Sequence, residues 1–399
     1  MQGPLDGIRI IDLTTMISGP TTTMLLADQG ADVIKVENPR GGDHTRGVST
    51  SRGGFAASFL NNNRNKRSVA LNLKDPRGVD VLKQLTRDAD VLVQNFRPGV
   101  VDRLGVGETA MRAVSPTLIY VSISGFGETG PYAQKPVYDP LVQALSGLTT
   151  VQAGSDEERP RLVRTIVPDK LTGYAAAQAI TAALFSRTRT GKGQHIKLSM
   201  LDTVVAFLWG SDMGGHTFVG DELRSETAQS FIDLIYQTSD GHISVAVQSN
   251  KEWAGLCRAF EKPQWLADER FKNAALRHEN IDERLTLTQE VLQTRKSADW
   301  LARLEAEDVP CAPVLTRREA IRHPQLLAND SVVEIDHPQA GRLRQSRAAP
   351  RFSETPTAFR HPAPPLGQHT EEVLLETGLL SKDIRKLADD GVVKLATST

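Results

Sequence analysis

The sequence has few cysteines, no surplus charge of either sign and no long apolar run. Its 399 residues include only Cys257 and Cys311, and neither belongs to a C-x-x-C pattern, so no disulfide framework or zinc knuckle is expected. The 47 basic and 48 acidic residues give a formal net charge of -1, which leaves no global field to hold nucleic acid. The apolar stretches are short or interrupted by polar residues, so we expect no membrane span.

Sequence patterns of metal and hydrolase sites are also missing. The nine histidines form no H-x-x-x-H or H-E-x-x-H pair, so we expect no metal site. No G-x-S-x-G motif occurs, which leaves an α/β-hydrolase unsupported. The N-terminus has neither a basic stretch nor an apolar core, so no signal peptide is expected. The composition suits a reducing cytoplasm.

What the sequence does contain is an alternation of strand and helix patterns. Residues 8–13 and 31–37 are typical of strands. Between them, Ser18-Gly19-Pro20 is typical of a helix start and Gly30 of a helix end. This βαβ unit predicts a parallel sheet with a right-handed crossover.

The same alternation continues along the first half of the chain. Further strands are expected at residues 68–73, 90–96, 118–123 and 195–198, with helices at 76–87, 101–104, 109–114 and 201–209. This order predicts an α/β fold with a doubly wound parallel sheet. In such sheets ligands bind beyond the carboxyl ends of the strands, where Asn95-Phe96-Arg97 and Ser124-Gly125-Phe126 are found.

A chain longer than about 250–300 residues is expected to form more than one domain. We predict a large domain at 1–210, a linker at 211–230, a small α+β domain at 231–320, and a return segment at 321–399 that packs on the large domain. The small domain should hold a hairpin around Asp240-Gly241, with strands 232–237 and 243–247, and helices 253–260, 281–292 and 300–307. From Thr316 the chain should be irregular, with a proline-rich stretch at 350–365 and a final helix at 371–389.

Asp169 stands at the start of a long helix pattern. Pro168 precedes it, and a run of small residues continues to about Arg187. Taken alone, this aspartate is interpreted as an ordinary N-cap. Asp139, ahead of another helix pattern, has the same interpretation. The alanines of the run predict a helix that lies close against a neighbouring element.

Two further motifs have competing interpretations. Residues 125–130 match G-x-G-x-x-G, but no helix pattern follows directly and the unit is not the first βα unit. A structural or substrate-covering loop is therefore favoured over a dinucleotide site. Residues 63–67 form a basic cluster that, with Lys74, Arg97 and Arg103, could hold a phosphorylated ligand or merely be solvated.

The ordered motifs together resemble family III CoA-transferases, the CaiB/BaiF type, over nearly the whole chain. The segments that carry the resemblance are LLADQGADVIKVE at 25–37, Gly42-Asp43, NKRS at 65–68, LNLK at 71–74, ADV at 89–91, NFRPG at 95–99, Asp169 with Thr172-Gly173, TGKGQ at 190–194, SMLD at 199–202 and PPLGQHT at 364–370.

The resemblance implies an enzyme that moves coenzyme A from an acyl-CoA donor to a carboxylic acid acceptor. It implies an interlocked homodimer, Asp169 as the nucleophile of an aspartyl-CoA thioester, and no permanently bound cofactor, since coenzyme A is part of the substrate. Carried over residue by residue, coenzyme A is expected near Ile17, Ser18, Leu71, Lys74, Asn95, Phe96, Arg97, Arg103 and Tyr138.

Two departures from the family pattern disfavour formyl or oxalyl transfer. The stretch 211–230 has only Gly214-Gly215 and Gly220 where the formyl-CoA and oxalate branch has a glycine run, and Ile17 replaces its glutamine. Arg46 and the region of Tyr138 are candidates to contact a distal carboxylate, which suggests dicarboxylic acids such as succinate.

Three alternatives stay open. The first is a racemase of α-methylacyl-CoA, although Tyr138-Asp139 stands where that branch has a His-Asp pair and a tyrosine is a poor base near neutral pH. The second is a CoA-binding protein without catalysis, in which Asp169 is only a cap. The third is an NAD-dependent oxidoreductase, which the missing dinucleotide fingerprint disfavours.

Overall fold

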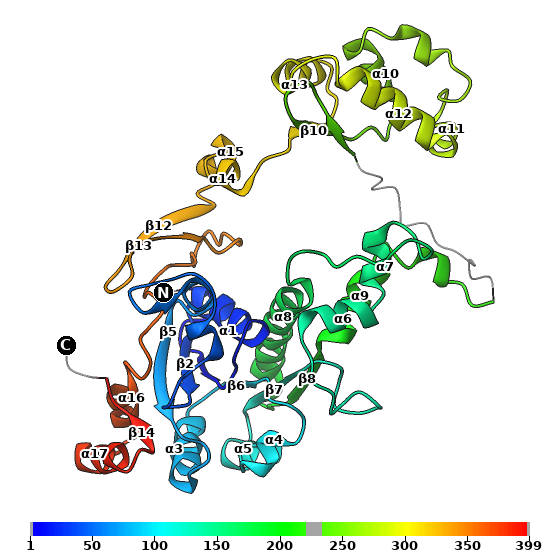
Figure 1. Ribbon diagram of the computed structural model, residues 1–399. Helices are drawn as coiled ribbons and strands as arrows, with labels where there is room; N and C mark the ends of the chain where they lie inside the picture. Colours follow the sequence, from blue (N-terminus) through cyan, green and yellow to red (C-terminus); the bar gives the residue numbers. More distant parts are fainter. Residues whose placement is uncertain (1–2, 221–233, 397–399) are drawn as a thin grey trace. The chain divides into compact units, whose positions relative to one another are not determined.

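The protein was analysed as a computed structural model that describes residues 3–220 and 234–396 (Figure 1). The chain divides into two compact units. The first comprises Met1–Thr227 and Asp330–Thr399, and the second comprises Ala228–Asn329. The part of the predicted linker from residue 221 onward, and the first residues of the predicted hairpin, lie outside the described residues.

A seven-stranded sheet forms the centre of the first unit. The strand order is β14-β5-β2-β1-β6-β7-β8, and every neighbouring pair is parallel except β14 with β5. Without the edge strand β14, this is the 3-2-1-4-5-6 order of a doubly wound sheet, with the reversal between β1 and β6. The strands are β1 (Arg9–Asp12), β2 (Asp32–Glu37), β5 (Lys66–Leu71), β6 (Val91–Gln94), β7 (Ile119–Ser124), β8 (His195–Ser199) and β14 (Val393–Lys394).

Helices cover both faces of this sheet (Figure 1). One face packs on α3 (Pro76–Arg87), α4 (Val100–Arg103), α5 (Glu108–Val114), α16 (Thr370–Glu376) and α17 (Ser381–Asp389). The other packs on α1 (Ser18–Asp28) and α8 (Val167–Thr190). Alternate strand residues face the two cores: Ile10 and Val33 belong to the α1/α8 side, and Ile11 and Ile34 to the α3 side. The predicted parallel α/β sheet is thus confirmed, with an antiparallel strand added at its edge.

The small residues of α8 allow it to lie close to α1. Ala176, Ala177 and Ile180 are buried in the core below α8. Gly173 packs on the first turn of α1, where an added Cβ would lie 2.9 Å from Thr21 Cβ and 3.0 Å from the Ser18 carbonyl oxygen. The close approach predicted from the alanine run is therefore confirmed, and Gly173 leaves no room for a side chain at this contact.

Shorter elements surround the strand ends. They are η1 (His44–Gly47), β3 (Ser51–Arg52), β4 (Phe55–Ala56), α2 (Ala57–Asn62), α6 (Asp139–Leu145), α7 (Leu148–Ala153), α9 (Met200–Trp209) and η2 (Gly214–His216).

The second unit holds a small antiparallel sheet and several helices. The hairpin predicted around Asp240-Gly241 is present as β9 (Ile235–Gln237) and β10 (His242–Val245), and β11 (Cys311–Pro313), which was not predicted, pairs with β10. Trp253, Trp300 and Phe271 are buried in its core. The helical elements are α10 (Asn250–Ala259), η3 (Pro263–Leu266), α11 (Ala274–Glu279), α12 (Ile281–Leu292) and α13 (Ser297–Ala306).

The region after Thr316 is more regular than predicted. It contains α14 (Arg317–Ala320), α15 (Pro324–Ala328) and a hairpin of β12 (Val332–His337) and β13 (Gly341–Ser346). The hairpin was missed because its strands carry the charged residues Glu334, Asp336, Arg342 and Arg344 between their few apolar ones. The predicted final helix is in fact two helices, α16 and α17, because Gly378 takes a φ of 87° just after α16 ends.

The motif at 364–370 provides hydrogen-bond acceptors for backbone N–H groups of β5. The Ser68 N–H donates to His369 Nδ1 at 3.1 Å, and the Ala70 N–H donates to Thr370 Oγ1 at 3.0 Å. The Gly367 N–H donates to Ser68 Oγ at 2.9 Å. The return segment is therefore an integral part of the first unit. Among the described helices, none is long and apolar enough to cross a membrane.

Candidate active site

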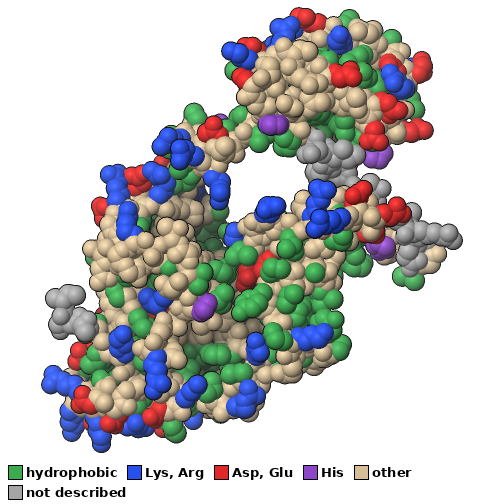
Figure 2. All heavy atoms as spheres, viewed as in Figure 1, with side chains coloured by type: hydrophobic (Ala, Val, Ile, Leu, Met, Phe, Trp, Pro, Cys, Tyr) green, Lys and Arg blue, Asp and Glu red, His purple; other side chains and the backbone are tan. Residues whose placement is uncertain are grey.

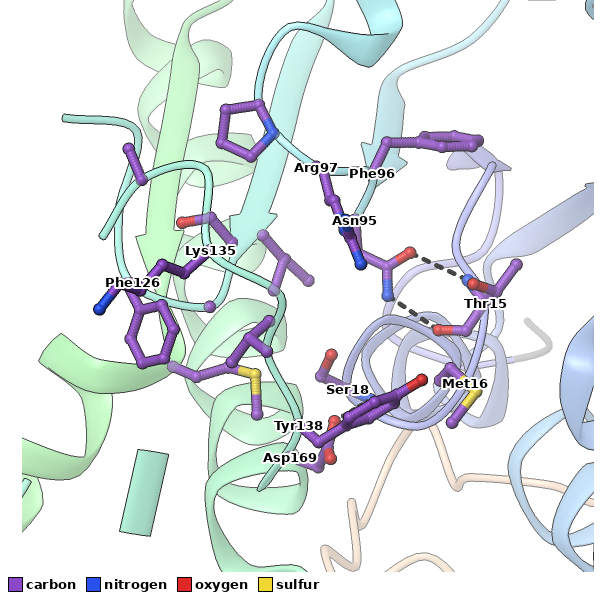
Figure 3. A pocket seen from close by; sticks show the side chains of 17 residues that line it. Thr15, Met16, Ser18, Asn95, Phe96, Arg97, Phe126, Lys135, Tyr138 and Asp169 are labelled. Carbon is purple, nitrogen blue, oxygen red and sulfur yellow. Dashed lines mark hydrogen bonds between the residues drawn. The ribbon is translucent and has the colours of Figure 1, made fainter. Parts of the chain in front are cut away.

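A cavity opens at the point where the strand order reverses. The loop after β1 and the loop after β6 form one side, and the loop after β7 with the start of α8 forms the other (Figure 3). Its volume is about 190 Å³. The lining residues are Thr15, Met16, Ser18, Asn95, Phe96, Arg97, Pro98, Ile123, Ser124, Gly125, Phe126, Ala133, Lys135, Val137, Tyr138, Asp169 and Met200.

Asp169 faces this cavity from the first turn of α8. It is not the N-cap, as the sequence interpretation proposed: Ile166 is the N-cap, Val167 begins the helix, and Asp169 is its third residue. The helix starts earlier because Pro168, with its fixed φ, fits inside the first turn. An acid in the first turn is stabilised by the positive end of the helix dipole. One carboxylate oxygen of Asp169 accepts a hydrogen bond from the Ser18 N–H at 3.3 Å.

Asp139 caps α8 from a different helix. It is the first residue of α6, whose N-cap is Tyr138, so the expectation that Asp139 caps its own helix is wrong. Its Oδ2 accepts the Asp169 N–H at 3.3 Å, and its Oδ1 accepts Gln143 Nε2 at 2.6 Å. The Asp139 side chain is buried. The first turn of α8 thus receives its acceptor from α6, which fixes the Asp169 backbone.

Burial and a like charge make Asp169 an unusual carboxyl group. Desolvation, followed by the nearby Asp139 carboxylate, raises the pKa of Asp169 from 3.8 to about 6, although the hydrogen bonds from Ser18 act in the opposite direction. Desolvation also raises the pKa of Asp139 above its ordinary value. A carboxylate with such a pKa is ionised near neutral pH but retains more basicity than an exposed aspartate, which suits a nucleophile or a base.

The structure gathers some of the predicted site residues and separates others. Ser18, Asn95, Phe96, Arg97 and Tyr138 line the cavity together with Asp169.

The remaining predicted residues do not line this cavity. Ile17 precedes Ser18 as the N-cap of α1. The Leu71 side chain is only 1% exposed and belongs to the core on the α3 side. Lys74 and Arg103 are exposed.

The Asn95 carboxamide is bonded to the neighbouring loop after β1. Its Oδ1 accepts the Thr15 N–H at 3.0 Å, and its Nδ2 donates to the Thr15 carbonyl at 2.8 Å, as the dashed lines in Figure 3 show. These two bonds link the loop after β1 to the loop after β6. Asn95 therefore has a structural role in joining these two loops, whether or not it also contacts a ligand.

The basic cluster at 63–67 has structural partners. Arg64 pairs with Asp28 at 2.7 Å and Lys66 pairs with Asp12 at 3.0 Å, both in buried positions. Arg67 pairs with Asp32 at 2.7 Å. The suggestion that these three cations hold a phosphorylated ligand is not supported by these contacts.

Arg46 is likewise engaged within the fold. Its Nε and Nη2 each donate to Glu37 at 2.7 Å, its Nη1 donates to the Pro364 carbonyl, and its guanidinium lies over the Phe59 ring. The suggestion that Arg46 contacts a distal carboxylate is therefore disfavoured by its environment.

The glycine loop at 125–130 follows β7 without opening a helix, as expected, and Ser124, Gly125 and Phe126, which were predicted to lie where ligands bind, line the cavity. Sequence reasoning missed other residues of the cavity wall. Lys135, farther along the same loop, also lines the cavity (Figure 3). Met16 was missed too, and its φ of 70° is uncommon for a residue with a side chain. No periodic pattern marks such loop residues, so only the loop's place after a strand could have suggested them.

The described residues contain no group of three or more His, Cys, Asp or Glu side chains arranged to hold a metal ion. The polar groups of the cavity include the Asp169 carboxylate and the cations Arg97 and Lys135.

Comparison with known proteins gives consistent matches over the whole chain. The model of CoA-transferase family III matches residues 5–370. Succinyl-CoA:glutarate CoA-transferase of Homo sapiens is 34% identical over 380 residues, which cover 94% of this chain and 86% of the human protein. Succinate–glutarate CoA-transferase of Agrobacterium fabrum is 35% identical over 383 residues, covering 94% of this chain and 95% of the relative.

Solved structures match as well. The crystal structure of a CaiB/BaiF family protein from Brucella suis is 31% identical, with a TM-score of 0.82, and the match covers 94% of this chain and 100% of that one. The α/β fold with a parallel-dominated central sheet is therefore shared with that structure.

Proposed function

The chain belongs to CoA-transferase family III, and on that premise we propose that it moves coenzyme A from an acyl-CoA to a carboxylic acid through an aspartyl-CoA thioester on Asp169. The observation that carries the proposal is the position of Asp169, a half-buried carboxylate in the first turn of α8 that faces the cavity and accepts a backbone N–H. A carboxylate is a weak nucleophile, so it has to be ionised, oriented and kept from water.

The first half of the reaction loads coenzyme A onto the enzyme. An Asp169 oxygen attacks the thioester carbonyl, the C–S bond breaks, and CoA departs as a thiolate. The donor acyl group and the Asp169 carboxylate are then joined as a mixed anhydride. The thiolate then attacks the aspartyl carbonyl, the anhydride C–O bond breaks, and the donor acid departs as a carboxylate. The product is an aspartyl-CoA thioester, and no net proton transfer is needed.

The second half runs the same steps in reverse with the acceptor. The acceptor carboxylate attacks the aspartyl thioester, CoA thiolate leaves, and the thiolate attacks the acyl carbon of the acceptor. Asp169 is released as a carboxylate. Negative charge develops on a carbonyl oxygen at each attack, and backbone N–H donors such as that of Ser18 are suited to stabilise it.

For the acid substrates we propose short dicarboxylic acids such as succinate and glutarate, the substrates in the names of two relatives. Arg97 and Lys135 line the same cavity as Asp169 and supply cations for a second carboxylate or for coenzyme A.

We also propose that the active form is an interlocked homodimer. Figure 2 shows hydrophobic side chains gathered over the part of the first unit where α6, α8 and α9 lie in Figure 1. The large apolar residues exposed on these helices are Leu141, Leu145, Tyr174, Phe185, Phe207 and Trp209. A second copy of the chain is a suitable partner for such a surface.

The test is to trap the thioester. The protein is incubated with succinyl-CoA without an acceptor, quenched with hydroxylamine, and digested for mass spectrometry. We expect a hydroxamate on the peptide that contains Asp169. The D169N variant should lose the adduct and reduce kcat by about 10⁴-fold or more, the scale found when a nucleophile is removed.

The control is D156N, which changes an exposed acid and should leave both readouts as in the wild type. If a broad panel of acyl-CoAs gives no adduct while coenzyme A still binds, the protein is a CoA-binding protein and the transferase proposal is wrong. Exchange of the α-proton of a 2-methylacyl-CoA in deuterium oxide, without transfer, would instead support a racemase.

A further inference from the structure

The loop that joins β1 to α1 is held by side chains from several strand ends. The Thr14 N–H donates to Asp12 Oδ1 at 2.9 Å, and the Thr14 carbonyl accepts Lys35 Nζ at 2.8 Å. The Thr15 backbone is bonded to the Asn95 carboxamide, as described above. Both backbone groups of Thr14 and of Thr15 are thus bonded to side chains, where a loop on a protein surface would use water.

Asp43 supplies the last of these bonds, to Met16. Its Oδ1 accepts the Met16 N–H at 3.2 Å and the Thr45 N–H at 2.9 Å, and its Oδ2 lies 2.9 Å from Lys35 Nζ. The Asp43 side chain is only 1% exposed. Met16 is in the left-handed region at a φ of 70°, a conformation that a residue with a side chain adopts only when its surroundings impose it.

The conformation of this loop determines the direction of the Ser18 N–H, which donates to Asp169. Ser18 follows Met16 by two residues and begins α1, and its N–H donates to Asp169 Oδ1 at 3.3 Å. Gly19 packs on Thr14 so closely that an added Cβ would lie 2.2 Å from Thr14 Cβ. A change at Met16 would therefore turn the Ser18 N–H relative to Asp169, because the surrounding packing leaves little room for compensation.

We propose that Asp43, in its ion pair with Lys35, is a positioning residue of the transfer reaction: it holds Met16 in the left-handed conformation and so aims the Ser18 N–H at the Asp169 carboxylate. This inference rests on the proposed function of Asp169. Asp43 does not line the cavity. Its effect is transmitted by the backbone, and a carboxylate is required because one oxygen accepts two N–H groups while the other faces an ammonium group.

The first test compares D43N with the wild type by steady-state kinetics across pH. An asparagine must direct its NH₂ group either at Lys35 or at the two N–H donors. We expect kcat to fall about 10- to 100-fold, the scale at which a misplaced catalytic group acts, with KM for the acyl-CoA changed less than about threefold. The acidic limb of kcat should also move to higher pH, because a bond from Ser18 that lowers the pKa of Asp169 is lost while Asp139 stays in place.

A second comparison tests the backbone route. Glycine adopts a positive φ readily, so M16G makes the conformation less dependent on Asp43. The activity ratio between M16G and M16G/D43N should be at least about fivefold smaller than the ratio between wild type and D43N. Equal ratios would show that Asp43 does not act through Met16, and would overturn the proposal.

The matched control is D28N, because Asp28 is also buried and also pairs with a cation, Arg64, away from the cavity. D28N should lower stability without moving the acidic limb. If D43N behaves like D28N, Asp43 has only a structural role and the proposal is wrong.

A readout without activity separates this inference from the proposed function. The difference in Tm between D43N and D43N/D169N, followed across pH, reports the pKa of Asp169 through its effect on stability. The pair of wild type and D169N gives the same pKa with Asp43 in place. A higher pKa of Asp169 in the D43N background supports the role of Asp43 even if no transferase activity is found. An equal pKa in the two backgrounds overturns that role even if the wild type is an active transferase.

Discussion

Asp169 meets two requirements that conflict. As the proposed nucleophile it should be shielded from water, but shielding penalises its charged form, and Asp139 adds a like charge. The dipole of α8 and the N–H of Ser18 offset part of this penalty. The balance leaves the pKa at about 6. At neutral pH the folded protein therefore holds an anion in an unfavourable place, which is a common arrangement at catalytic sites.

This arrangement predicts that D169N is more stable than the wild type at pH 7.5. The unfolded chain releases the Asp169 proton near 3.8 and the folded chain near 6, so the folded state binds more protons between these values. Stability due to this group is therefore present below about pH 4 and is lost as pH rises to about 6. We expect D169N to raise the free energy of unfolding by about 1–3 kcal/mol at pH 7.5, with the difference shrinking towards pH 4.5.

Urea unfolding at both pH values measures this difference. D28N is the contrasting variant, because it leaves the buried Arg64 without its carboxylate partner and should destabilise the protein at both pH values. A D169N variant that is less stable than the wild type at pH 7.5 would show that the charged Asp169 carboxylate does not destabilise the folded protein.

At this scale the sequence predicted where a long helix starts but not how its first turn is held. The helix start at Pro168-Asp169 was recognisable, because proline and aspartate favour such positions, whereas the acceptor of the Asp169 N–H is the Asp139 carboxylate on another helix. A contact between residues 30 positions apart leaves no periodic signal. The same holds for Asp43 and Met16, whose relation depends on how β1 and β2 are placed side by side.

At the scale of elements, the contact between α1 and α8 brings Ser18 and Asp169 together. Gly173 allows that contact, since a methyl group there would meet Thr21 and the Ser18 carbonyl. On an isolated helix, replacing glycine with alanine stabilises by about 1 kcal/mol. Here the packing term has the opposite sign and should dominate, because overpacking a dense contact costs about 1–3 kcal/mol.

We therefore predict that G173A lowers the free energy of unfolding by about 1–3 kcal/mol and reduces kcat by about tenfold through the displaced Ser18 N–H. Chemical denaturation and transferase assays measure the two effects. A182S, on the exposed side of the same helix, should change stability by less than about 0.5 kcal/mol. A G173A protein that is more stable than the wild type would show that the helices can separate without cost.

Elements were predicted well where a periodic apolar pattern existed. The helix at 76–87 and its inward residues Val79, Val81, Leu82 and Leu85 are confirmed, because an amphipathic helix on a sheet records its buried face in the sequence. The hairpin of β12 and β13 was missed because its apolar residues are few and separated by charged ones. Its inward face is completed by contacts with distant residues, such as the bond from Gln345 to the Leu60 carbonyl.

At the scale of the molecule, the chain passes from the first unit to the second and returns. Residues up to Thr227 and from Asp330 onward belong to one unit, and the segment between them belongs to the other. The return is fixed by contacts such as those of Asn65, whose Nδ2 donates to the Ala358 carbonyl at 2.9 Å and whose Oδ1 accepts the His361 N–H at 2.9 Å. The return segment is therefore held to the rest of the first unit by noncovalent packing, and the proposed interlocking of two copies depends on this packing.

The proposed interlocked dimer predicts an unusual response to dilution. An ordinary dimer dissociates when its concentration falls below its Kd, whereas linked chains separate only after the return segment has been detached from the first unit. We expect the dimer mass to persist at nanomolar concentration in native mass spectrometry. Tagged and untagged proteins mixed in native buffer should exchange no subunits over days, because such detachment requires loss of many buried contacts at once.

Unfolding the mixture in urea and refolding it should produce tagged–untagged dimers, which controls for a tag that prevents assembly. T370V offers a graded test, because it removes the acceptor of the Ala70 N–H and should weaken the return segment by about 1–3 kcal/mol. Exchange should then become measurable in native buffer, at a rate that does not depend on dilution. Exchange in the wild type that accelerates on dilution would instead indicate two subunits that associate without being linked.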